Sequence, residues 1–431
     1  MVTFGSSAAE CMTGCDGAPY VAAPFEAKAA NVRMQATKRL KLLLLTDSFL
    51  PHAGGSREYY FNAYRNLVEL GESEVTVLTK KIPGWEKFDE ESCTETFRIH
   101  RSFKPLNSWK WYELPKGILP LLTTVWYVMR ESPAILHAGD LYPQGVIAMT
   151  LKQICGLPYV VYCHGEEIPQ INRFRYQPRI RDRIYKNADA VIAASEFTRQ
   201  NLLGLGVPEE RIHKIIPGVV SERFATARML RDPRTIHGLE GKNIILTVAR
   251  LIPRKGHRVV LQAMAELANE IPNVHYLIVG RGSEESSLRE AAQELGLSEK
   301  VTFSGYVPED QLVDYYHACD IMVMPNCEAA NGDVEGFGIV FLEANAAGKP
   351  VIGGNTGGAA EAIEDGITGF LVNPNSPRDV ALALKRLLLD RGLRQKMGAA
   401  GAERVRKEFN WKTRAEALSK LNRSILHIGS S

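Results

Sequence analysis

Short apolar runs alternate with amphipathic segments along the first half of the chain. Leu42 to Leu45 are apolar at every position, as in a strand that is buried on both faces of a sheet. The segment after Gly54 and Gly55 has helical periodicity and ends at Gly71, a residue type that often closes a helix. Helix-like segments at 178–186 and 196–203 separate the further runs, which are VTVLT, AILHA, YVVYC, AVIAA and HKIIP.

The same pattern begins again after the segment IPGVVSERF. Six short strands are predicted, and helix-like segments at 258–270, 286–295 and 308–318 separate them. The strand runs are NIILTVA, HYLIVG, KVTFSG, DIMVMP, KPVIGG and GFLVN. Alternating strands and helices form parallel sheets covered on both faces, so the pattern predicts an α/β chain with two doubly wound domains. We place the domains at 39–218 and 219–405, and we expect a ligand in the cleft between them.

Residues 1–38 differ from the rest because they lack periodicity and are rich in alanine and glycine. They carry neither the basic start nor the apolar core of a signal peptide, and three acidic residues weaken the case for a transit peptide. We therefore predict a disordered extension, or a chain whose natural start is Met34.

Composition excludes several classes of protein. A net charge of +3 over 431 residues gives no electrostatic footprint for nucleic acid. The longest apolar run, Ile118 to Met129, is too short to span a bilayer. The seven scattered cysteines are odd in number and lack zinc spacing, which indicates a reducing cytoplasm rather than a disulfide framework.

The first strand leads into a glycine-rich turn, PHAGGSRE. It lacks the G-x-G-x-x-G pattern, and no Walker-A lysine pattern occurs, which argues against a dinucleotide oxidoreductase and a P-loop NTPase. Gly54 and Gly55 could bring backbone amides to an anion at a helix start, or they could only form a tight turn.

A cluster of basic residues, VARLIPRKGHR, follows the strand NIILTVA and opens a helix. The amino end of a helix is already positive, so additional cations there are unfavourable unless an anion is bound. A diphosphate would remove this conflict, and a solvated basic turn is the alternative. The basic residues are Arg250, Arg254, Lys255, His257 and Arg258.

The stretch EGFGIVFLE places Glu335 in a loop and Glu343 inside the following helix. Gly336 and Gly338 leave uncrowded amides at the helix start, where an anion or a hydroxyl can bind. An offset of eight residues corresponds to roughly 80° around a helix, so the two acids do not share one face. We expect them to contact different parts of an elongated ligand; otherwise Glu335 is an exposed loop acid and Glu343 is paired with a cation.

In this order the motifs resemble the retaining GT-B glycosyltransferases of family four, from Lys41 to the segment FNWKTRAEAL. The resemblance implies two Rossmann-like domains that face each other across a cleft, and a final helix at 406–431 that crosses back to the first domain. It further implies that Arg250 and Lys255 hold the donor diphosphate. Glu335 would bind hydroxyls of the donor sugar, and Glu343 would bind those of the ribose.

The resemblance also assigns backbone contacts. The amides from Phe337 through Gly338 and Ile339 to Val340 would meet the sugar and the distal phosphate. Gly55, with Gly54, would meet the phosphate from the other domain. The backbone at Tyr306 and Val307 would face the base.

His164 follows the strand YVVYC and corresponds to a histidine that orients the donor's 6-hydroxyl in the family. Glu166 and Glu167 could contact the acceptor or only solvent. The predicted catalytic residues are thus His164, Arg250, Lys255 and Glu335.

The implied reaction is the transfer of a hexose from a nucleotide sugar to a hydroxyl group, with retention at the anomeric carbon and without a metal or another cofactor. GDP-mannose is the expected donor, and the expected acceptor is a glycan, a polyprenyl-linked sugar or a lipid. The alternatives are a UDP-dependent glucosyl- or N-acetylglucosaminyltransferase, a nucleotide-sugar epimerase, and a silent nucleotide-binding protein.

The segment INRFRYQPRIRDRIYK is dense in arginine. With Trp109, Trp111 and Trp126 it could contact an anionic membrane, which would make a cytoplasmic protein peripheral on the inner face of the membrane. A solvated helix face is the alternative. The basic residues are Arg173, Arg175, Arg179, Arg181, Arg183 and Lys186.

Overall fold

The computed structural model describes residues 39–51, 54–103, 114–165, 167, 177–225, 231–329 and 332–428. The predicted extension at 1–38 lies outside the described residues, and so do Trp109, Trp111, Glu166, Arg173 and Arg175.

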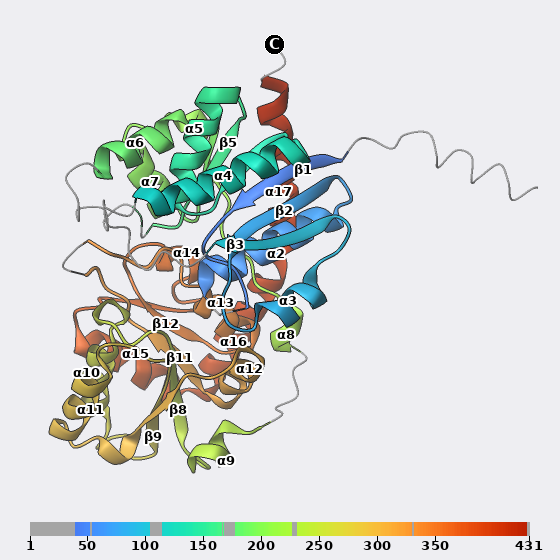
Figure 1. The fold of residues 1–431 in the computed structure, drawn as a ribbon. Coiled ribbons are helices and arrows are strands. Elements are labelled where there is room, and N and C mark those ends of the chain that lie inside the picture. Colours follow the sequence, from blue (N-terminus) through green and yellow to red (C-terminus); the bar gives the residue numbers. More distant parts are fainter. Residues whose placement is uncertain are drawn as a thin grey trace, which may run out of the picture. The chain divides into compact units, whose positions relative to one another are not determined.

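Seven parallel strands form the first sheet in the order β3-β2-β1-β4-β5-β6-β7 (Figure 1). The order runs in opposite directions from β1 and β4, so the switch point of the sheet lies between these two strands. The strands are β1 (Leu40–Leu45), β2 (Ser73–Lys80), β3 (Phe97–Phe103), β4 (Ile135–Ala138), β5 (Tyr159–Cys163), β6 (Ala190–Ala193) and β7 (Ile212–Lys214).

Helices cover both faces of this sheet because its central strands are apolar on both sides. Side chains of α2 and α17 build the core on one face, and those of α4, α5, α6 and α7 pack on the other. The helices of this half are α2 (Gly55–Glu69), α3 (Trp85–Ser92), α4 (Leu114–Glu131), α5 (Val146–Cys155), α6 (Gln177–Asn187), α7 (Glu196–Gly204) and α17 (Trp411–Ile428).

Six parallel strands form the second sheet in the order β10-β9-β8-β11-β12-β13, with its switch point between β8 and β11. The strands are β8 (Asn243–Val248), β9 (Val274–Val279), β10 (Val301–Gly305), β11 (Ile321–Met324), β12 (Val351–Gly354) and β13 (Gly369–Val372).

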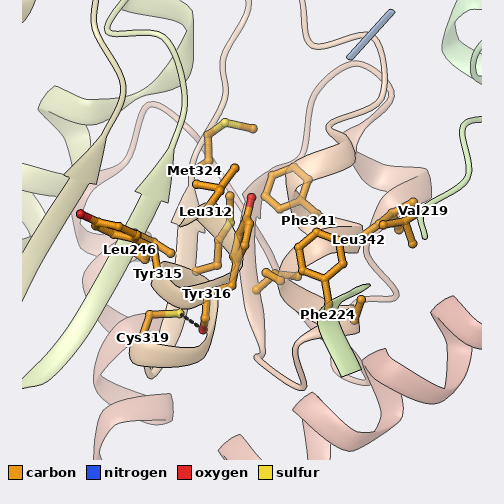
Figure 2. Close-up of a cluster of buried hydrophobic side chains, with 14 of the residues drawn as sticks. Val219, Phe224, Leu246, Leu312, Tyr315, Tyr316, Cys319, Met324, Phe341 and Leu342 are labelled. Atoms are coloured by element: carbon orange, nitrogen blue, oxygen red, sulfur yellow. Dashed lines mark hydrogen bonds between the residues drawn. The ribbon is translucent and has the colours of Figure 1, made fainter. Parts of the chain in front are cut away.

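Helices α10, α11 and α15 cover one face of the second sheet, and α8, α12 and α13 cover the other. Helix α16 contributes to both cores, with Met397 in the first and Val405 in the second. Figure 2 shows the second of these cores, in which Tyr316 packs against Phe224 with ring centroids 5.7 Å apart. The helices are α8 (Ser221–Ala225), α9 (Pro233–His237), α10 (His257–Leu267), α11 (Glu285–Glu294), α12 (Glu309–Ala318), α13 (Ile339–Ala346), α14 (Ala359–Ala362), α15 (Pro377–Leu389) and α16 (Arg391–Glu408).

The chain returns to the first sheet next to the segment that leaves it. The Val219 amide donates to the Phe409 carbonyl at 2.8 Å. A Cβ atom at Gly218 would lie 2.9 Å from both that carbonyl and the Trp411 ring, so only glycine fits this approach. Trp411 in turn packs edge-on against Tyr59 of α2, at 5.5 Å between centroids.

The predicted α/β class with two doubly wound sheets is confirmed, and all six predicted strands of the second sheet are present. The hydrophobic pattern missed β3, an edge strand whose apolar run is broken by charged residues. One of these, Arg101, is buried because it forms an ion pair with Asp89 at 2.8 Å. The long apolar run at 118–129 lies in α4, and no helix in the described part of the chain is long and apolar enough to cross a membrane.

Candidate functional site

Polar side chains gather beyond the carboxyl ends of the strands at both switch points, where open parallel sheets bind ligands. Asp47 and Asp140 follow β1 and β4 of the first sheet. The basic turn at 250–255 follows β8, and the loop at 325–338 follows β11 of the second sheet.

Arg254 is the most buried cation of the second sheet's cluster. It lies in η5 (Pro253–Lys255), and its side chain is only 2% exposed. It donates to Asp333 at 2.9 Å and to Glu335 at 3.0 Å. The alternative of a solvated basic turn is therefore wrong for Arg254. Sequence reasoning gave this arginine no separate role and missed Asp333, since a carboxylate two residues before Glu335 has no signature of its own.

Glu335 is held by two cations. Besides Arg254, the Lys255 ammonium forms an ion pair with the same carboxylate oxygen. Burial alone would raise the pKa of Glu335, but the charges of Lys255 and Arg254 outweigh it and hold the pKa below its ordinary value. Glu335 is therefore ionised at neutral pH, and its side chain is 13% exposed, so the alternative of an exposed loop acid is wrong.

The other members of the basic cluster lie in different surroundings. Arg250 is exposed, and its charge also lowers the pKa of Glu335. Burial lowers the pKa of His257 to about 4, so this histidine is neutral and does not belong to the predicted cationic cluster. Arg258 is exposed and donates to the Ser287 carbonyl at 3.4 Å, on the side of α11.

The glycine turn after Glu335 contacts the first sheet. A Cβ atom at Gly336 would lie 2.0 Å from the His164 carbonyl oxygen, so the two backbones touch. Gly338 has φ of 83° and precedes α13, whose first amides, at Ile339 and Val340, have no acceptor within the helix. The ring of Phe337 is buried against Phe409.

The amino end of α2 faces this turn. A Cβ atom at Gly55 would lie 3.6 Å from Cδ1 of Ile339, the first residue of α13. Gly54 caps α2 with its backbone, and both glycines are exposed. Two positive helix ends, one from each sheet, thus come together. Glu335, which pairs with Lys255, lies beside the start of α13, with its Cγ atom 3.6 Å from the Cβ position at Gly338.

His164 lies at the end of β5, and its Nε2 atom is 2.6 Å from the Tyr60 hydroxyl. That hydroxyl donates its single proton to the Gly139 carbonyl, so Nε2 of His164 must carry the ring proton and donate. Burial lowers the pKa of His164 to about 4, against the opposing charge of Asp140. The neutral ring therefore presents Nδ1 as a hydrogen-bond acceptor. Sequence reasoning missed Tyr60 because its helix carries three tyrosines with no distinguishing pattern.

The turn after β5 also explains one of the two neighbouring acids. A carboxylate oxygen of Glu167 accepts hydrogen bonds from the amides of His164 at 3.0 Å and Gly165 at 2.9 Å. Glu167 thus supports the backbone that carries His164.

Glu343 points to a tyrosine rather than to a cation. Its carboxylate accepts a hydrogen bond from the Tyr316 hydroxyl at 2.6 Å, so the alternative, in which Glu343 is paired with a cation, is wrong. Burial, followed by the charge of Glu309, raises its pKa to about 7. The charge of Glu58 also raises the pKa of Glu343, so α2 of the first sheet lies close enough to Glu343 to influence it.

The raised pKa of Glu343 predicts a pH-dependent gain in stability for Glu343→Gln. The folded protein binds this proton more tightly than the unfolded chain, so wild-type stability falls as pH rises from about 4.5 to about 7. At pH 8 the variant should gain free energy of unfolding of about 3 kcal/mol, and at pH 4 the gain should vanish. Urea unfolding at both pH values measures this, with the exposed Glu299→Gln as control. An equal gain at both pH values would contradict the assignment.

Tyr306 and Val307, whose backbone is predicted to face the base, lie next to β10, the strand at one end of the second sheet. Val307 is half-buried against the core of Figure 2, and Tyr306 is 58% exposed. Both follow β10, so their backbone is at a carboxyl strand end. Within the described residues, no group of three or more His, Cys, Asp or Glu side chains is arranged to hold a metal ion.

The basic segment around α6 is only partly a surface patch. Arg179, Arg183 and Lys186 are exposed, and their spacing places them on one side of the helix. Arg181 is 9% exposed and forms an ion pair with Asp182 at 2.8 Å, so it does not belong to the predicted patch.

Comparisons with known proteins agree with this architecture. The family model for group 1 glycosyl transferases matches residues 232–404, and that for Glycosyltransferase Family 4 matches residues 53–223. The chain is 30% identical over 396 residues to the GDP-mannose-dependent alpha-(1-6)-phosphatidylinositol monomannoside mannosyltransferase of Mycolicibacterium smegmatis, over 88% of this chain and 97% of that protein.

Solved structures show the same fold. Sucrose-phosphate synthase from Thermosynechococcus elongatus is similar with a TM-score of 0.76 and 25% identity, over 91% of this chain and 100% of the other. Anabaena HepE in complex with UDP and glucose has a TM-score of 0.72 and 21% identity, over 90% and 100%. The chain therefore belongs to the family of group 1, family 4 glycosyltransferases, and it is a glycosyltransferase with the GT-B fold.

Proposed function

We propose that the protein transfers mannose from GDP-mannose to a hydroxyl of a glycan or lipid-linked acceptor, with retention at the anomeric carbon. The observation that carries the proposal is the meeting of the amino ends of α2 and α13 beside Lys255 and Glu335. Helix ends and a lysine supply the positive charge that a leaving diphosphate needs. The donor is chosen because the mycobacterial relative is a GDP-mannose-dependent enzyme.

Each residue has a defined role in this proposal. Lys255 and Arg250 bind the diphosphate, Glu335 and the amides of residues 337–340 bind the sugar, and Glu343 binds the ribose. His164 accepts a hydrogen bond from the sugar at Nδ1. The bond from the anomeric carbon to the phosphate oxygen breaks, and its electron pair stays with the diphosphate. The acceptor oxygen attacks from the same face, and its proton passes to the departing phosphate oxygen.

Lys255 contacts Glu335 directly, and its ammonium group has three N–H donors, so it can hold Glu335 and a phosphate of the donor at once. A phosphate oxygen would bind a second N–H of Lys255, while Arg254 would keep Glu335 ionised and in place. Glu335 could then accept hydrogen bonds from sugar hydroxyls without becoming an unpaired buried charge.

A panel of GDP- and UDP-sugars, with and without a lipid extract, tests the function by release of nucleoside diphosphate. The proposal expects the fastest acceptor-dependent release from GDP-mannose. A preference for UDP-glucose or UDP-N-acetylglucosamine would support the UDP-dependent alternative. Interconversion of the sugar would indicate an epimerase, and binding without turnover would indicate a silent nucleotide-binding protein.

The proposal includes no metal or other cofactor, because Arg250, Lys255 and the two helix ends supply the countercharge for the diphosphate. Transfer should therefore persist when EDTA is added in excess. Loss of activity in EDTA that Mg²⁺ or Mn²⁺ restores would contradict this part of the proposal.

We further propose that the acceptor is membrane-bound and that the protein works peripherally on the inner face of the cytoplasmic membrane. Helices α4 and α6 cover the same face of the first sheet (Figure 1). On α4, Leu122, Trp126 and Met129 are 59%, 50% and 78% exposed, and α6 carries the basic row of Arg179, Arg183 and Lys186. Exposed apolar side chains and cations on one face of the protein suit an anionic bilayer surface.

Binding to phosphatidylglycerol vesicles should weaken about 30-fold in the double variant Arg179→Ser, Arg183→Ser, because each basic residue near an anionic surface contributes about 1 kcal/mol. Co-sedimentation with the vesicles measures this loss of binding. The charge-matched control is the double variant Lys385→Ser, Lys412→Ser: the Lys385 side chain is 39% exposed, and Lys412 lies at an exposed position of α17. Unchanged binding would remove the membrane role of this row.

A further inference from the structure

A second polar cluster lies at the switch point of the first sheet and has no role in the proposed binding of the donor. Asp140, after β4, accepts hydrogen bonds from the Thr46 hydroxyl at 2.8 Å, the Asp47 amide at 2.6 Å and the Ser48 hydroxyl at 3.3 Å. These bonds fix the turn after β1. Asp47 is thereby held at the carboxyl edge of the sheet, and its side chain is partly exposed.

The buried side-chain amide of Gln144 is part of this cluster. Its Nε2 atom donates to the Asp47 carboxylate at 2.8 Å, and the residue is only 4% exposed. Its Oε1 atom, bonded to the same carbon, has no hydrogen-bond partner among the described residues. A buried amide oxygen without a donor is unfavourable, so this atom indicates a hydroxyl or water that binds beside Asp47.

The cluster adjoins the residue that orients His164. Tyr60 donates to the carbonyl of Gly139, the neighbour of Asp140 in the chain, and binds His164 through the same oxygen. A Cβ atom at Gly139 would lie 2.9 Å from Cβ of Thr46 and 3.0 Å from the Tyr60 ring, so these groups are closely packed. Two side chains, Tyr60 and His164, therefore connect the cluster to the proposed position of the reacting sugar.

The charges around Asp47 suit a neutral ligand. Burial, followed by the charge of Asp140, raises the pKa of Asp47 to about 6, so its carboxylate is ionised at neutral pH and can only accept. The positive charge of Lys80, at the end of β2, lowers the pKa of Asp47. Burial lowers the pKa of Arg57 in α2, and the negative charge of Asp140 raises it. Two cations and two carboxylates balance, and an anionic group placed on Asp47 would meet two negative charges.

We propose that Asp47 and Gln144 form the acceptor subsite, where two neighbouring hydroxyls of a neutral polyol ring donate to the Asp47 carboxylate and to Oε1 of Gln144. That the bound polyol is the acceptor rests on the proposed function. Binding of the polyol itself does not require turnover. Vicinal hydroxyls match the pair, because Nε2 of Gln144 donates to the Asp47 carboxylate and so holds the amide oxygen and the carboxylate as neighbouring acceptors. Any phosphate of the acceptor would lie outside this subsite.

Saturation-transfer NMR on the full chain with saturating GDP tests the subsite. The probes are myo-inositol and methyl α-D-mannopyranoside as neutral polyols, and mannose 6-phosphate as an anionic one. Wild-type protein should saturate the ring protons of the neutral polyols, and Asp47→Ala and Gln144→Met should each weaken their binding at least tenfold. Glu86→Gln, at an exposed position of α3, is the control and should bind like wild type.

Affinity for GDP and slow hydrolysis of GDP-mannose in water separate this proposal from the proposed function. Affinity for GDP should be unchanged in the two variants, because GDP is proposed to bind at the second sheet, and unchanged affinity also shows that the variants fold. Polyol binding that survives in Gln144→Met or in Asp47→Ala, or wild-type binding of mannose 6-phosphate alone, would overturn the subsite. Polyol binding by a wild-type protein that neither binds GDP nor hydrolyses GDP-mannose would instead contradict the proposed function and leave the subsite standing.

Discussion

Replacement of Lys255 by alanine is expected to lower the rate of hexose transfer by about 10²- to 10³-fold, the usual effect of removing one preorganised charge from a leaving group. The lysine lies next to the meeting amino ends of two helices, where the diphosphate would develop negative charge as the sugar departs. The measurement is kcat for release of nucleoside diphosphate at saturating GDP-mannose, with binding of GDP followed separately by calorimetry.

Lys242→Ala is the matched control for this variant. Lys242 is exposed and precedes β8, so it lies at the opposite, amino edge of the same sheet. It should retain wild-type kcat. If Lys255→Ala also keeps kcat within threefold, the diphosphate is not bound where we propose.

Glu335 calls for a milder substitution than alanine. Arg254 is 2% exposed and depends on Glu335 and Asp333 for charge compensation, so truncation of Glu335 would also destabilise the loop. Glu335→Gln keeps a hydrogen-bond acceptor for Arg254 and separates the loss of sugar binding from a loss of fold.

Gly336→Ala should reduce transfer by at least about 10²-fold, because a displacement of about 1 Å in a reacting group can cost that much. The added Cβ would lie 2.0 Å from the His164 carbonyl oxygen. Backbone atoms occupy both sides of this contact, so one of the two turns must shift, and with it the start of α13 or the position of His164. Steady-state transfer and calorimetric GDP affinity measure the effect.

Gly204→Ala is the appropriate comparison for a glycine substitution. Nothing lies within 4 Å of the Cβ position at Gly204, which is in the last turn of α7. This variant should be as active as wild type, since alanine is the better helix former. Full activity in Gly336→Ala would mean that the two sheets do not need this contact during catalysis.

Much of the fold could be predicted because the central strands of a parallel sheet are buried on both faces. Leu42 to Leu45 and the six strands of the second sheet each appear as a short apolar run. The edge strand β3 escaped this criterion, since Arg101 in its interior becomes acceptable only when the fold places Asp89 beside it. The sequence does not show which distant acid will neutralise a buried arginine.

The candidate site divides in the same way. Glu335, Lys255 and Glu343 stand out by their spacing after strands and by the resemblance of their motifs to a known family. Arg254, Tyr60 and Gln144 gain their importance from partners that lie 81, 104 and 97 residues away in the chain. Such pairs have no fixed spacing, so no local pattern reveals them.

The sequence by itself therefore determined the α/β class, the two sheets and the glycosyltransferase motifs, because these depend on periodicity and short-range spacing. Only the tertiary structure decided the protonation and partners of the site: that Glu335 is held ionised by two cations, that Glu343 has a tyrosine instead of a cation, and that His164 and His257 are neutral. Burial and the distance between charges set these properties, and both exist only once the strands and helices have been assembled.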